Sequence, residues 1–492
     1  MTIDITTTQV TAGVAGAIIL VDIIIRVIAV VVVPRNRRPT AGMAWLLAIF
    51  FFPVLGGLIF LLIGNPKLPK HRREKQAEVD EFIRESTHGI ERVSDSAIWP
   101  GWFAGVVRLN RTLGAMPLIG SNSASLIGEY EGSLHAMTEA IRGAERYVHV
   151  EFYIFAYDRT TAPFFDALGE AVARGIEVRV LMDHIASVRV KGYRKTLKRL
   201  DRMGVRWQLM LPVQPLKGRY QRPDLRNHRK ILVVDGEVGF AGSQNVIDRA
   251  YHKPSNIRRG LKWQELVARV EGPIVSGLDA IFATDWYLET GEAPARDDIT
   301  PFEQEGEAQD LDCQVVPSGP GYPNENNLKL FLALMYAARE RIILTSPYFV
   351  PDEAMLRAIS GATQRGVHVE LFVSEIGDQA LVYHAQRSYY EALLRAGVRI
   401  YMYQAPYILH SKHFTIDDDV AVIGSSNMDI RSFELNMEIS LLVRGASFVR
   451  EMRAVEDRYR EQSQELTLED WMRQPLRSTI LDNLARLTSA LQ

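Results

Sequence analysis

Two stretches of the chain have the same pattern of residues, and this repeat decides the fold. Residues 228–245 read HRKILVVDGEVGFAGSQN, and residues 410–427 read HSKHFTIDDDVAVIGSSN. The two stretches lie 182 positions apart (410 minus 228), and their polar and glycine residues match with identical internal spacing. Chance does not explain such a match in one chain, so we interpret the pair as one duplicated half-site. The matched residues are His228, Lys230, Asp235, Gly242, Ser243 and Asn245, and then His410, Lys412, Asp417, Gly424, Ser425 and Asn427.

A strand, a helix and a second strand are predicted before each copy of the motif. Both copies follow a β-type run, a helical pattern, an Arg-Gly turn and an apolar run of strand length. This order is typical of a βαβ unit with a parallel sheet, and it predicts an α/β fold with two similar domains. The strands are expected at 147–155 and 176–182 in the first domain and at 341–348 and 367–373 in the second, with helices ending near 173 and 364.

Each motif is also predicted to form a β-hairpin. Residues two apart on a strand share a face, so the histidine and lysine of each motif are expected to point into one space. The acidic turn after each strand leads into a predicted return strand, at 238–241 and at 420–423. Each Gly-Ser pair is then expected close to the start of its hairpin.

The first half contains an insertion before its histidine. From Gly204 to His228 the chain takes 24 positions, whereas from Gly397 to His410 it takes 13, so eleven extra residues lie within 208–227. Two interpretations stay open, a solvated loop and a basic lip that meets anionic headgroups. The basic residues of this stretch are Lys217, Arg219, Arg222 and Arg226.

Two apolar runs near the N-terminus predict a transmembrane hairpin. The runs cover about 10–33 and 43–63, and each is long enough to cross a bilayer core of about 30 Å as a helix. Asp22 and Arg26 interrupt the first run four positions apart, where they can pair on a helix. Pro53 is expected to kink the second run. A signal peptide is disfavoured, because no basic residue precedes the first run and a second run follows.

Basic residues beside the two runs bear on membrane orientation. Five follow the second run and three lie in the loop between the runs, which favours a multi-pass cell-membrane protein with a cytoplasmic body but leaves the topology open. The five are Lys67, Lys70, Arg72, Arg73 and Lys75, and the three are Arg35, Arg37 and Arg38.

These patterns divide the chain into five segments. The C-terminal tail has amphipathic spacing, for which packing on the body is favoured over lying on the membrane. The predicted segments are a transmembrane hairpin at 1–73, a helical connector at 74–120, a first domain at 121–287, an acidic linker at 288–312, and a second domain with the helical tail at 313–492.

Length and composition exclude some classes of protein. At 492 residues the chain is too long for one typical core, so two domain-sized units are expected. The formal net charge of −2 gives no global polycation, which weakens a nuclease hypothesis. Cys313 is the only cysteine, so an internal disulfide and a cysteine-based zinc site are excluded.

Two histidines, two lysines and two asparagines at one centre suit a phosphodiester. Lysine and asparagine side chains can hold the non-bridging oxygens through the transition state. One imidazole can attack phosphorus while the other protonates the departing alcohol, because histidine titrates near neutrality. A zinc site on His228 and His410 is disfavoured by the adjacent lysines, and no metal or other cofactor is expected.

The paired motif is similar to the signature of the phospholipase D superfamily. The stretches 424–438, 387–390, 346–349 and 40–47 resemble bacterial cardiolipin synthases more narrowly. The resemblance implies two α/β/α sandwich domains that face each other in a pseudo-twofold arrangement across one active site. It implies that His228 is the nucleophile, forming a phosphohistidine, and that His410 is the acid and then the base.

The resemblance also assigns roles to the other candidate residues. The candidate catalytic set is His228, Lys230, Asp235, His410, Lys412 and Asp417, of which the aspartates are implied to be mainly structural. A downstream carboxylate is implied to orient each histidine, with Glu438 at that position in the second half and Glu265 the nearest equivalent in the first. The candidate phosphate-binding residues are Ser243, Asn245, Ser425 and Asn427.

The implied reaction transfers a phosphatidyl group from one phosphatidylglycerol to another, giving cardiolipin and glycerol. The expected partner is therefore an anionic phospholipid in the membrane; no nucleic acid is expected, and a homo-oligomer stays possible. A phospholipase D-type phosphodiesterase, which uses water or another alcohol, is the alternative, because the motif residues are common to both. A non-catalytic scaffold is disfavoured because both motifs are intact.

Overall fold

The computed structural model describes residues 4–35, 37, 39–87, 99–292 and 311–487. The chain forms two compact units, one of residues 1–67 with 222–224 and the other of residues 68–221 with 225–492. The first unit holds the predicted membrane segments. The second unit, called the body below, holds both copies of the motif.

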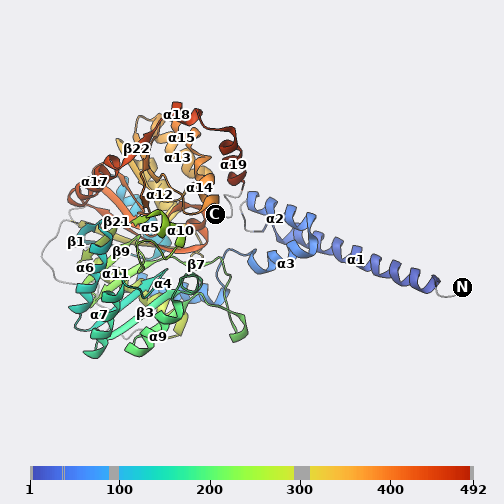
Figure 1. Ribbon diagram of the computed structural model, residues 1–492, viewed down its shortest axis with the longest axis horizontal. Coiled ribbons are helices and arrows are strands. Elements are labelled where there is room, and N and C mark those ends of the chain that lie inside the picture. The colour runs from blue at the N-terminus through green and yellow to red at the C-terminus, as the bar shows by residue number, and fades with distance from the viewer. Residues whose placement is uncertain (1–3, 36, 38, 88–98, 293–310, 488–492) are drawn as a thin grey trace. The chain divides into compact units, whose positions relative to one another are not determined.

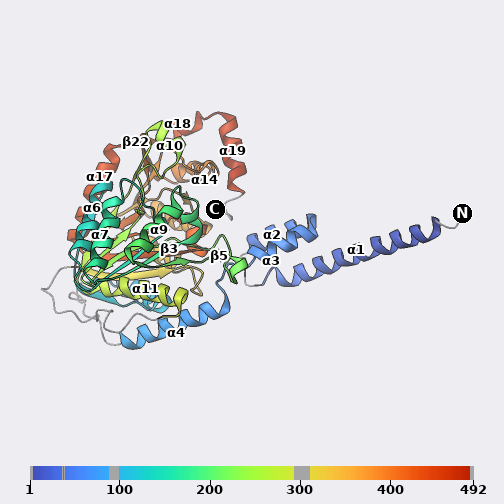
Figure 2. The same cartoon turned by 60° about the horizontal axis from the view of Figure 1, so that its bottom comes forward.

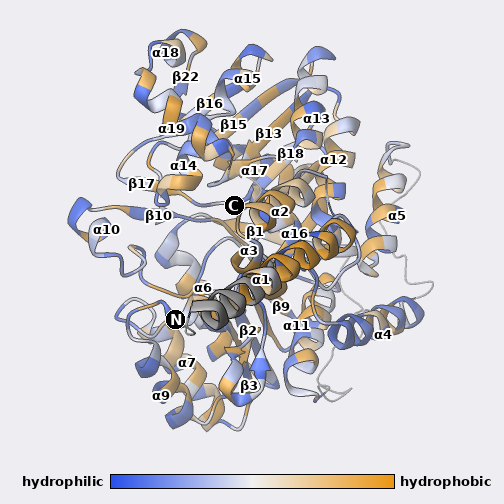
Figure 3. Ribbon diagram, turned by 90° about the vertical axis from the view of Figure 1, so that its right-hand side faces the viewer, coloured by the Kyte–Doolittle hydropathy of each residue, from blue (hydrophilic) through white to orange (hydrophobic). Residues whose placement is uncertain are grey.

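The N-terminal unit has one long apolar helix and two short ones among the residues that the structure describes. Helix α1 (Asp4–Val32) contains a stretch, Val14–Val32, that is long and apolar enough to cross a membrane. Its Asp22 and Arg26 carboxylate and guanidinium groups lie 3.0 Å apart, which confirms the predicted pair. Figure 3 shows the apolar residues of α1 in orange, and most of them are exposed.

The second predicted span is not one continuous helix. It is divided into α2 (Pro39–Phe51) and α3 (Pro53–Ile63), of 13 and 11 residues. Proline lacks an amide hydrogen and clashes with the preceding turn, so Pro53 starts a new helix. Neither short helix alone reaches the length of about 20 residues that a bilayer core requires.

A single 16-stranded sheet runs through the body and contains both predicted halves. In each half three parallel strands are followed by an antiparallel hairpin, as the motifs predicted. Figure 1 shows the two halves above and below one another, joined at their centre. The first-half strands are β2 (Tyr147–Phe152), β3 (Glu177–Asp183), β4 (Arg206–Met210), β8 (Lys230–Val234), β9 (Val238–Gly242) and β11 (Val267–Glu271). The second-half strands are β13 (Arg341–Thr345), β15 (His368–Ser374), β16 (Arg399–Tyr403), β18 (His413–Ile416), β19 (Val420–Gly424), β21 (Asn436–Arg444) and β22 (Ser463–Leu466).

Two further strands join the halves. Strand β1 (Leu118–Ile127) pairs with β11 of the first half and with β12 (Leu311–Ser318), which in turn pairs with β21. Residues 293–310, which include most of the predicted acidic linker, lie outside the described residues, and α11 (Ile274–Thr290) extends into the start of that linker. Pairing between β1 and β12 makes the sheet continuous, so the two halves share one core.

Helices cover both faces of the sheet. Figure 2 shows α7 (Ala162–Ala173) and α9 (Tyr193–Met203) on one side of the first-half strands and α11 on the other. Buried residues of α11 and α17 (Ala446–Glu461) pack in one apolar cluster with strands from both halves. This shared cluster holds the halves together beneath the motif residues. The other body helices include α4 (Lys70–Ser86), α5 (Phe103–Gly114), α6 (Tyr130–Arg142), α12 (Asn326–Ala337), α13 (Glu353–Gln364), α14 (Ala380–Arg387) and α15 (Tyr390–Arg395).

Candidate active site

Each motif histidine lies at a point where the two halves pair through short parallel strands. Strand β7 (Arg226–Asn227), directly before His228, pairs with the start of β21 in the second half. Strand β17 (Tyr407–Leu409), directly before His410, pairs with β10 (Lys262–Gln264) in the first half. The His228 amide donates to the Met437 carbonyl at 2.8 Å, and the His410 amide donates to the Gln264 carbonyl at 2.7 Å.

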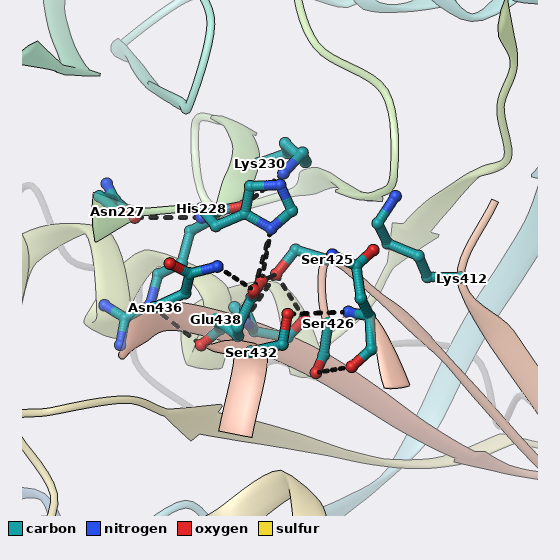
Figure 4. Close-up of polar contacts among 12 residues, drawn as sticks. Asn227, His228, Lys230, Lys412, Ser425, Ser426, Ser432, Asn436 and Glu438 are labelled. Carbon is teal, nitrogen blue, oxygen red and sulfur yellow. Dashed lines mark hydrogen bonds and ion pairs between the residues drawn. The ribbon is translucent and has the colours of Figure 1, made fainter. Parts of the chain in front are cut away.

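This pairing exchanges the glutamates between the halves. His228 Nδ1 lies 2.9 Å from Glu438 Oε1, and His410 Nδ1 lies 2.8 Å from Glu265 Oε1. Figure 4 shows the first of these contacts. Sequence analysis placed Glu265 in the same half as His228 and Glu438 in the same half as His410. The structure corrects that grouping, because each glutamate contacts the histidine of the other half. The strand pairing with the opposite half ends at Met437 or Gln264, one residue before the glutamate.

Each motif lysine donates a hydrogen bond to the backbone carbonyl of its own motif histidine. Lys412 Nζ donates to the His410 carbonyl at 2.6 Å, and Lys230 Nζ donates to the His228 carbonyl. The predicted strands begin later than expected, at Lys230 and at His413, so neither histidine is a strand residue. The histidine and lysine of each motif still lie together. Lys412 Nζ is 3.2 Å from His410 Nε2, and Lys230 Nζ bonds the His228 carbonyl.

Burial lowers the pKa of both lysines. It brings the pKa of Lys230 to about 7 and that of Lys412 to about 8, while the nearby glutamates oppose the shift. A buried ammonium group gains most from an anionic partner. The pair is therefore suited to hold a phosphate group.

The two histidine–glutamate pairs differ electrostatically. Burial and the charges of Lys230 and Lys412 hold the pKa of His228 well below its ordinary value. Burial also raises the pKa of its partner Glu438 to about 7. Burial lowers the pKa of His410 as well, but Glu265 opposes that shift. Burial alone would raise the pKa of Glu265, yet His410 holds it below its ordinary value.

The two pairs consequently favour different protonation states. A neutral His228 that donates from Nδ1 to Glu438 leaves the lone pair of Nε2 available. A His410 paired with an ionised Glu265 is the better proton donor.

The motif serines hold the glutamates and the backbone. Ser425 Oγ donates to Glu438 Oε2 at 2.5 Å and accepts from the Ile439 amide at 2.9 Å. Ser243 Oγ donates to the Leu266 carbonyl at 3.2 Å and accepts from its amide at 3.0 Å. Both hydroxyl groups are thus engaged within the protein. The structure therefore favours a positioning role over the phosphate-binding role that the sequence analysis gave them.

The motif asparagines are not equivalent. Asn245 Oδ1 accepts from the Ile154 amide at 3.0 Å, and its Nδ2 donates to Tyr251 Oη at 3.0 Å. Tyr251 in turn donates to Glu265 at 2.9 Å. Asn427 is 5% exposed, and its Oδ1 has no hydrogen-bond partner among the described residues. The Asn427 side chain is therefore not held by the kind of contacts that hold Asn245.

The motif aspartates lie away from the histidines, at the far ends of the hairpins. The Asp235 carboxylate accepts three backbone amides, from Glu145, Arg146 and Tyr147, each at 2.8 Å. Asp417 accepts the matching amides of Arg339, Glu340 and Arg341. These contacts favour a structural role over a catalytic one for both aspartates. The structural role implied by the resemblance matches these contacts.

Three tyrosines beside the histidines were not selected from the sequence. The ring centroids of Tyr153 and His228 lie 4.8 Å apart, and those of Tyr251 and Tyr348 each lie 6.2 Å from His410. Tyr153 and Tyr348 each follow a central strand by one to three residues, which was the available signal. Tyr251 gives no such signal, because it lies in a loop at a positive φ of 56°.

Most of the described insertion forms a small exposed hairpin. It comprises β5 (Val213–Gln214), a 3-10 turn (Pro215–Lys217) and β6 (Arg219–Tyr220), and Leu216 at its tip is fully exposed. Arg226 is not part of a basic lip. It is buried and pairs with Asp183 at 3.2 Å.

Comparisons with known proteins agree with this geometry. A family model described as cardiolipin synthase, PLD-like domain matches residues 137–286 and 331–459, and a model described as phospholipase D-nuclease N-terminal matches residues 18–65. Cardiolipin synthase A of Proteus mirabilis is 31% identical over 471 residues, covering 93% of this chain and 94% of the relative. Cardiolipin synthase A of Pectobacterium carotovorum is 32% identical over 469 residues, with the same coverage.

A solved structure shares the fold. Phosphatidylserine synthase of Haemophilus influenzae superposes with a TM-score of 0.60 at 14% identity, covering 79% of this chain and 100% of that one. At this identity the likeness concerns the fold alone.

Proposed function

The chain belongs to the cardiolipin synthase family of the phospholipase D superfamily, and from this premise we propose that it joins two phosphatidylglycerol molecules into cardiolipin and releases glycerol. The observation that supports this most directly is the pair of motif histidines at one centre, each bonded through Nδ1 to a glutamate of the opposite half. Transfer in two steps needs one nucleophile and one acid–base group, which is what this pair supplies.

In the first proposed step, His228 attacks the donor phosphorus. Its Nε2 lone pair forms the N–P bond while the bond from phosphorus to the glycerol oxygen breaks. The proton on His410 passes to that oxygen, and glycerol leaves as a neutral alcohol. Lys230 and Lys412 balance the charge on the non-bridging oxygens, which raises the pKa of both ammonium groups towards the ordinary value.

In the second step, His410 acts as the base. It takes the hydroxyl proton of a second phosphatidylglycerol, whose oxygen then attacks phosphorus as the N–P bond breaks. His228 returns to its neutral form and His410 to its protonated form, so the cycle closes without a nucleotide. One phosphodiester replaces another of similar kind.

We propose that the enzyme works at the cell membrane, with α1 as its anchor. The apolar stretch Val14–Val32 and the N-terminal family match at 18–65 support this location. A multi-pass arrangement that includes α2 and α3, with the body on the cytoplasmic side, extends the same proposal. A body held at the bilayer meets lipid hydroxyl groups at high local concentration, which favours transfer over hydrolysis.

The test incubates the purified full-length protein in detergent with phosphatidylglycerol alone. Mass spectrometry should detect cardiolipin and glycerol in equal amounts, and the His228→Asn variant should produce neither. Phosphatidic acid as the only lipid product would instead identify a phosphodiesterase that uses water.

A further inference from the structure

The C-terminal helix α19 (Leu476–Arg486) turns its apolar side away from the protein. Five apolar side chains on it, or directly after it, are more than half exposed. At about 100° per residue, these positions fall within an arc of about 140° around the helix. A helix of this pattern on a soluble protein normally buries that side. The five residues, called the α19 apolar face below, are Leu476, Ile480, Leu481, Leu484 and Leu487, with exposures of 81, 57, 51, 56 and 81%.

Polar contacts fix which side of α19 faces inward. The helix packs against α14 through Asp482 and Ala485, its two buried residues. Asp482 accepts from His384 Nδ1 at 2.6 Å and from Arg387 Nε at 3.3 Å. Arg387 also donates to Ser478 Oγ at 3.1 Å. Rotating the helix to bury its leucines would turn Asp482 outward and take the carboxylate partner away from His384 and Arg387, which is unfavourable. The apolar face is therefore held outward.

The exposed charges of α19 are basic. Arg477 and Arg486 are exposed, whereas Asp482, the helix's acidic residue, is buried and paired. Long arginine side chains can keep their charge in the headgroup layer while their stems lie along apolar surface. Leucine on one side with arginine beside it is the pattern of a helix that lies in an anionic membrane interface.

The inward side of α19 is linked through α14 to the His410 side of the active site. Helix α14, on which α19 packs, accepts the Phe349 amide through Gln386 Oε1 at 2.8 Å. The neighbouring Tyr348 has its ring 6.2 Å from His410 and donates to Asp378 at 2.8 Å. A continuous set of contacts thus runs from α19 through α14 and Tyr348 to His410.

We propose that α19 lies in the interface of an anionic phospholipid bilayer, with its apolar face among the upper acyl chains. The membrane would then present lipid headgroups at the His410 side of the site. A second copy of the chain fits this face less well. An eleven-residue helix offers a strip about 16 Å long and about 10 Å wide, far below the roughly 800 Å² per partner of a stable dimer. This surface goes beyond the proposed reaction, because it concerns how the body meets the bilayer.

A fluorophore placed at either of two positions on α19 tests the proposal in the full-length protein. Cys313 is the chain's only cysteine and is buried, and burial raises the pKa of its thiol, so an introduced cysteine reacts selectively. We would label Leu484→Cys with an environment-sensitive fluorophore and reconstitute the protein into phosphatidylcholine bilayers that contain phosphatidylglycerol. A lipid with a spin label near the top of its acyl chain should quench this fluorophore severalfold more than one at Thr479→Cys, the matched control on the polar exposed side.

Equal quenching at the two positions would overturn the proposal. So would energy transfer between labelled copies in bilayers without spin label, because it would assign the α19 apolar face to self-association. Either result leaves the proposed reaction unaffected, since the product assay in detergent is independent of this surface.

A second pair of variants guards against a folding effect. Ile480→Glu with Leu484→Glu should lower cardiolipin formation about tenfold in bilayers, because two apolar side chains lose their membrane contact. Activity in detergent micelles should be unchanged. Thr479→Glu, at an exposed position outside the arc of the apolar face, should leave both activities unchanged. An equal loss in micelles and in bilayers would show a structural role and overturn the membrane assignment.

Discussion

The two halves of the body have the same motif but surround their histidines differently. His228 lies against Glu438, whose pKa burial raises to about 7, whereas His410 lies against Glu265, whose pKa is held below its ordinary value. Because each glutamate comes from the opposite half, neither half contains a complete site. Duplication thus supplies the geometry, and we propose that the different glutamate environments set which histidine attacks and which transfers protons.

The asparagines show the same divergence. Asn245 is engaged by Ile154 and Tyr251, while the Asn427 oxygen has no partner among the described residues. Tyr251 therefore links the first-half asparagine to Glu265 and so to His410. We propose that Asn427 contacts the substrate, whereas Asn245 supports Glu265 through Tyr251.

The largest expected effect separates the two histidines. His228→Asn removes the nucleophile, so no covalent phosphatidyl-enzyme should form from radiolabelled phosphatidylglycerol. His410→Asn keeps the nucleophile and removes the acid–base group, which should slow formation of the intermediate by about 10²–10⁴-fold. Equal loss of labelling in both variants, measured after long incubation, would contradict the assignment of roles.

Glu265→Gln tests the electrostatic difference through pH. Glu265 raises the pKa of His410 by its charge and hydrogen bond, so its removal lowers that pKa further. The acid form of His410 is required, and it is lost as pH rises through this pKa. The alkaline limb of the rate profile should therefore move to lower pH, with a loss of about 10²-fold at neutral pH.

Glu438→Gln is the matched comparison. Glu438 is already partly protonated near pH 7, because burial raises its pKa to about 7. Its replacement by a neutral amide should therefore cost less at pH 6 than at pH 8, and it should leave the alkaline limb set by His410 in place. An identical shift in both variants would mean that the two pairs are electrostatically equivalent.

A smaller effect is expected at the asparagines. Asn427→Ala removes a side-chain Nδ2 group that can donate to the charged phosphate, and such bonds contribute about 1.5–3 kcal/mol. The rate at low phosphatidylglycerol should fall about 10–100-fold. Asn245→Ala should instead act through Tyr251 and Glu265, changing the pH profile more than the apparent KM. A larger increase in KM for Asn245→Ala than for Asn427→Ala would mean that Asn245 is the asparagine that contacts the substrate.

Much of the body follows from local patterns in the sequence. The predicted βαβ units and return strands appear as β2, α7 and β3, as β13, α13 and β15, and as β9 and β19. These elements are set by alternation of apolar residues and by turn residues, which are properties of short segments. The histidine–lysine pairs were found for the same reason, because their repeat is visible in the sequence.

Contacts between distant segments could not be predicted from these local patterns. The pairing of β7 with β21 and of β10 with β17 joins short strands from opposite halves, and it alone decides which glutamate meets which histidine. The outward orientation of the α19 apolar face could not be predicted either, since amphipathic spacing does not tell which side a helix buries. The side that α19 buries depends on contacts of Asp482 with His384 and Arg387, about 95 positions earlier in the chain.

The smallest effect on catalysis is expected at the motif aspartates, where the comparison concerns stability. Asp235 binds three amides, one of them the buried Tyr147, whereas the amides bound by Asp417 lie at a more exposed turn that water can reach. Asp235→Ala should therefore lower the free energy of unfolding by about 2–3 kcal/mol and Asp417→Ala by about 1 kcal/mol.

Urea unfolding of the detergent-solubilised protein, followed by tryptophan fluorescence, measures the difference between these two turns. Asp418→Ala, whose side chain is 79% exposed, is the control and should change stability by less than about 0.5 kcal/mol. The rate per folded molecule should stay within about twofold of the parent in both turn variants, because neither carboxylate reaches the histidines. A loss of rate without a loss of stability would return the aspartates to the catalytic set.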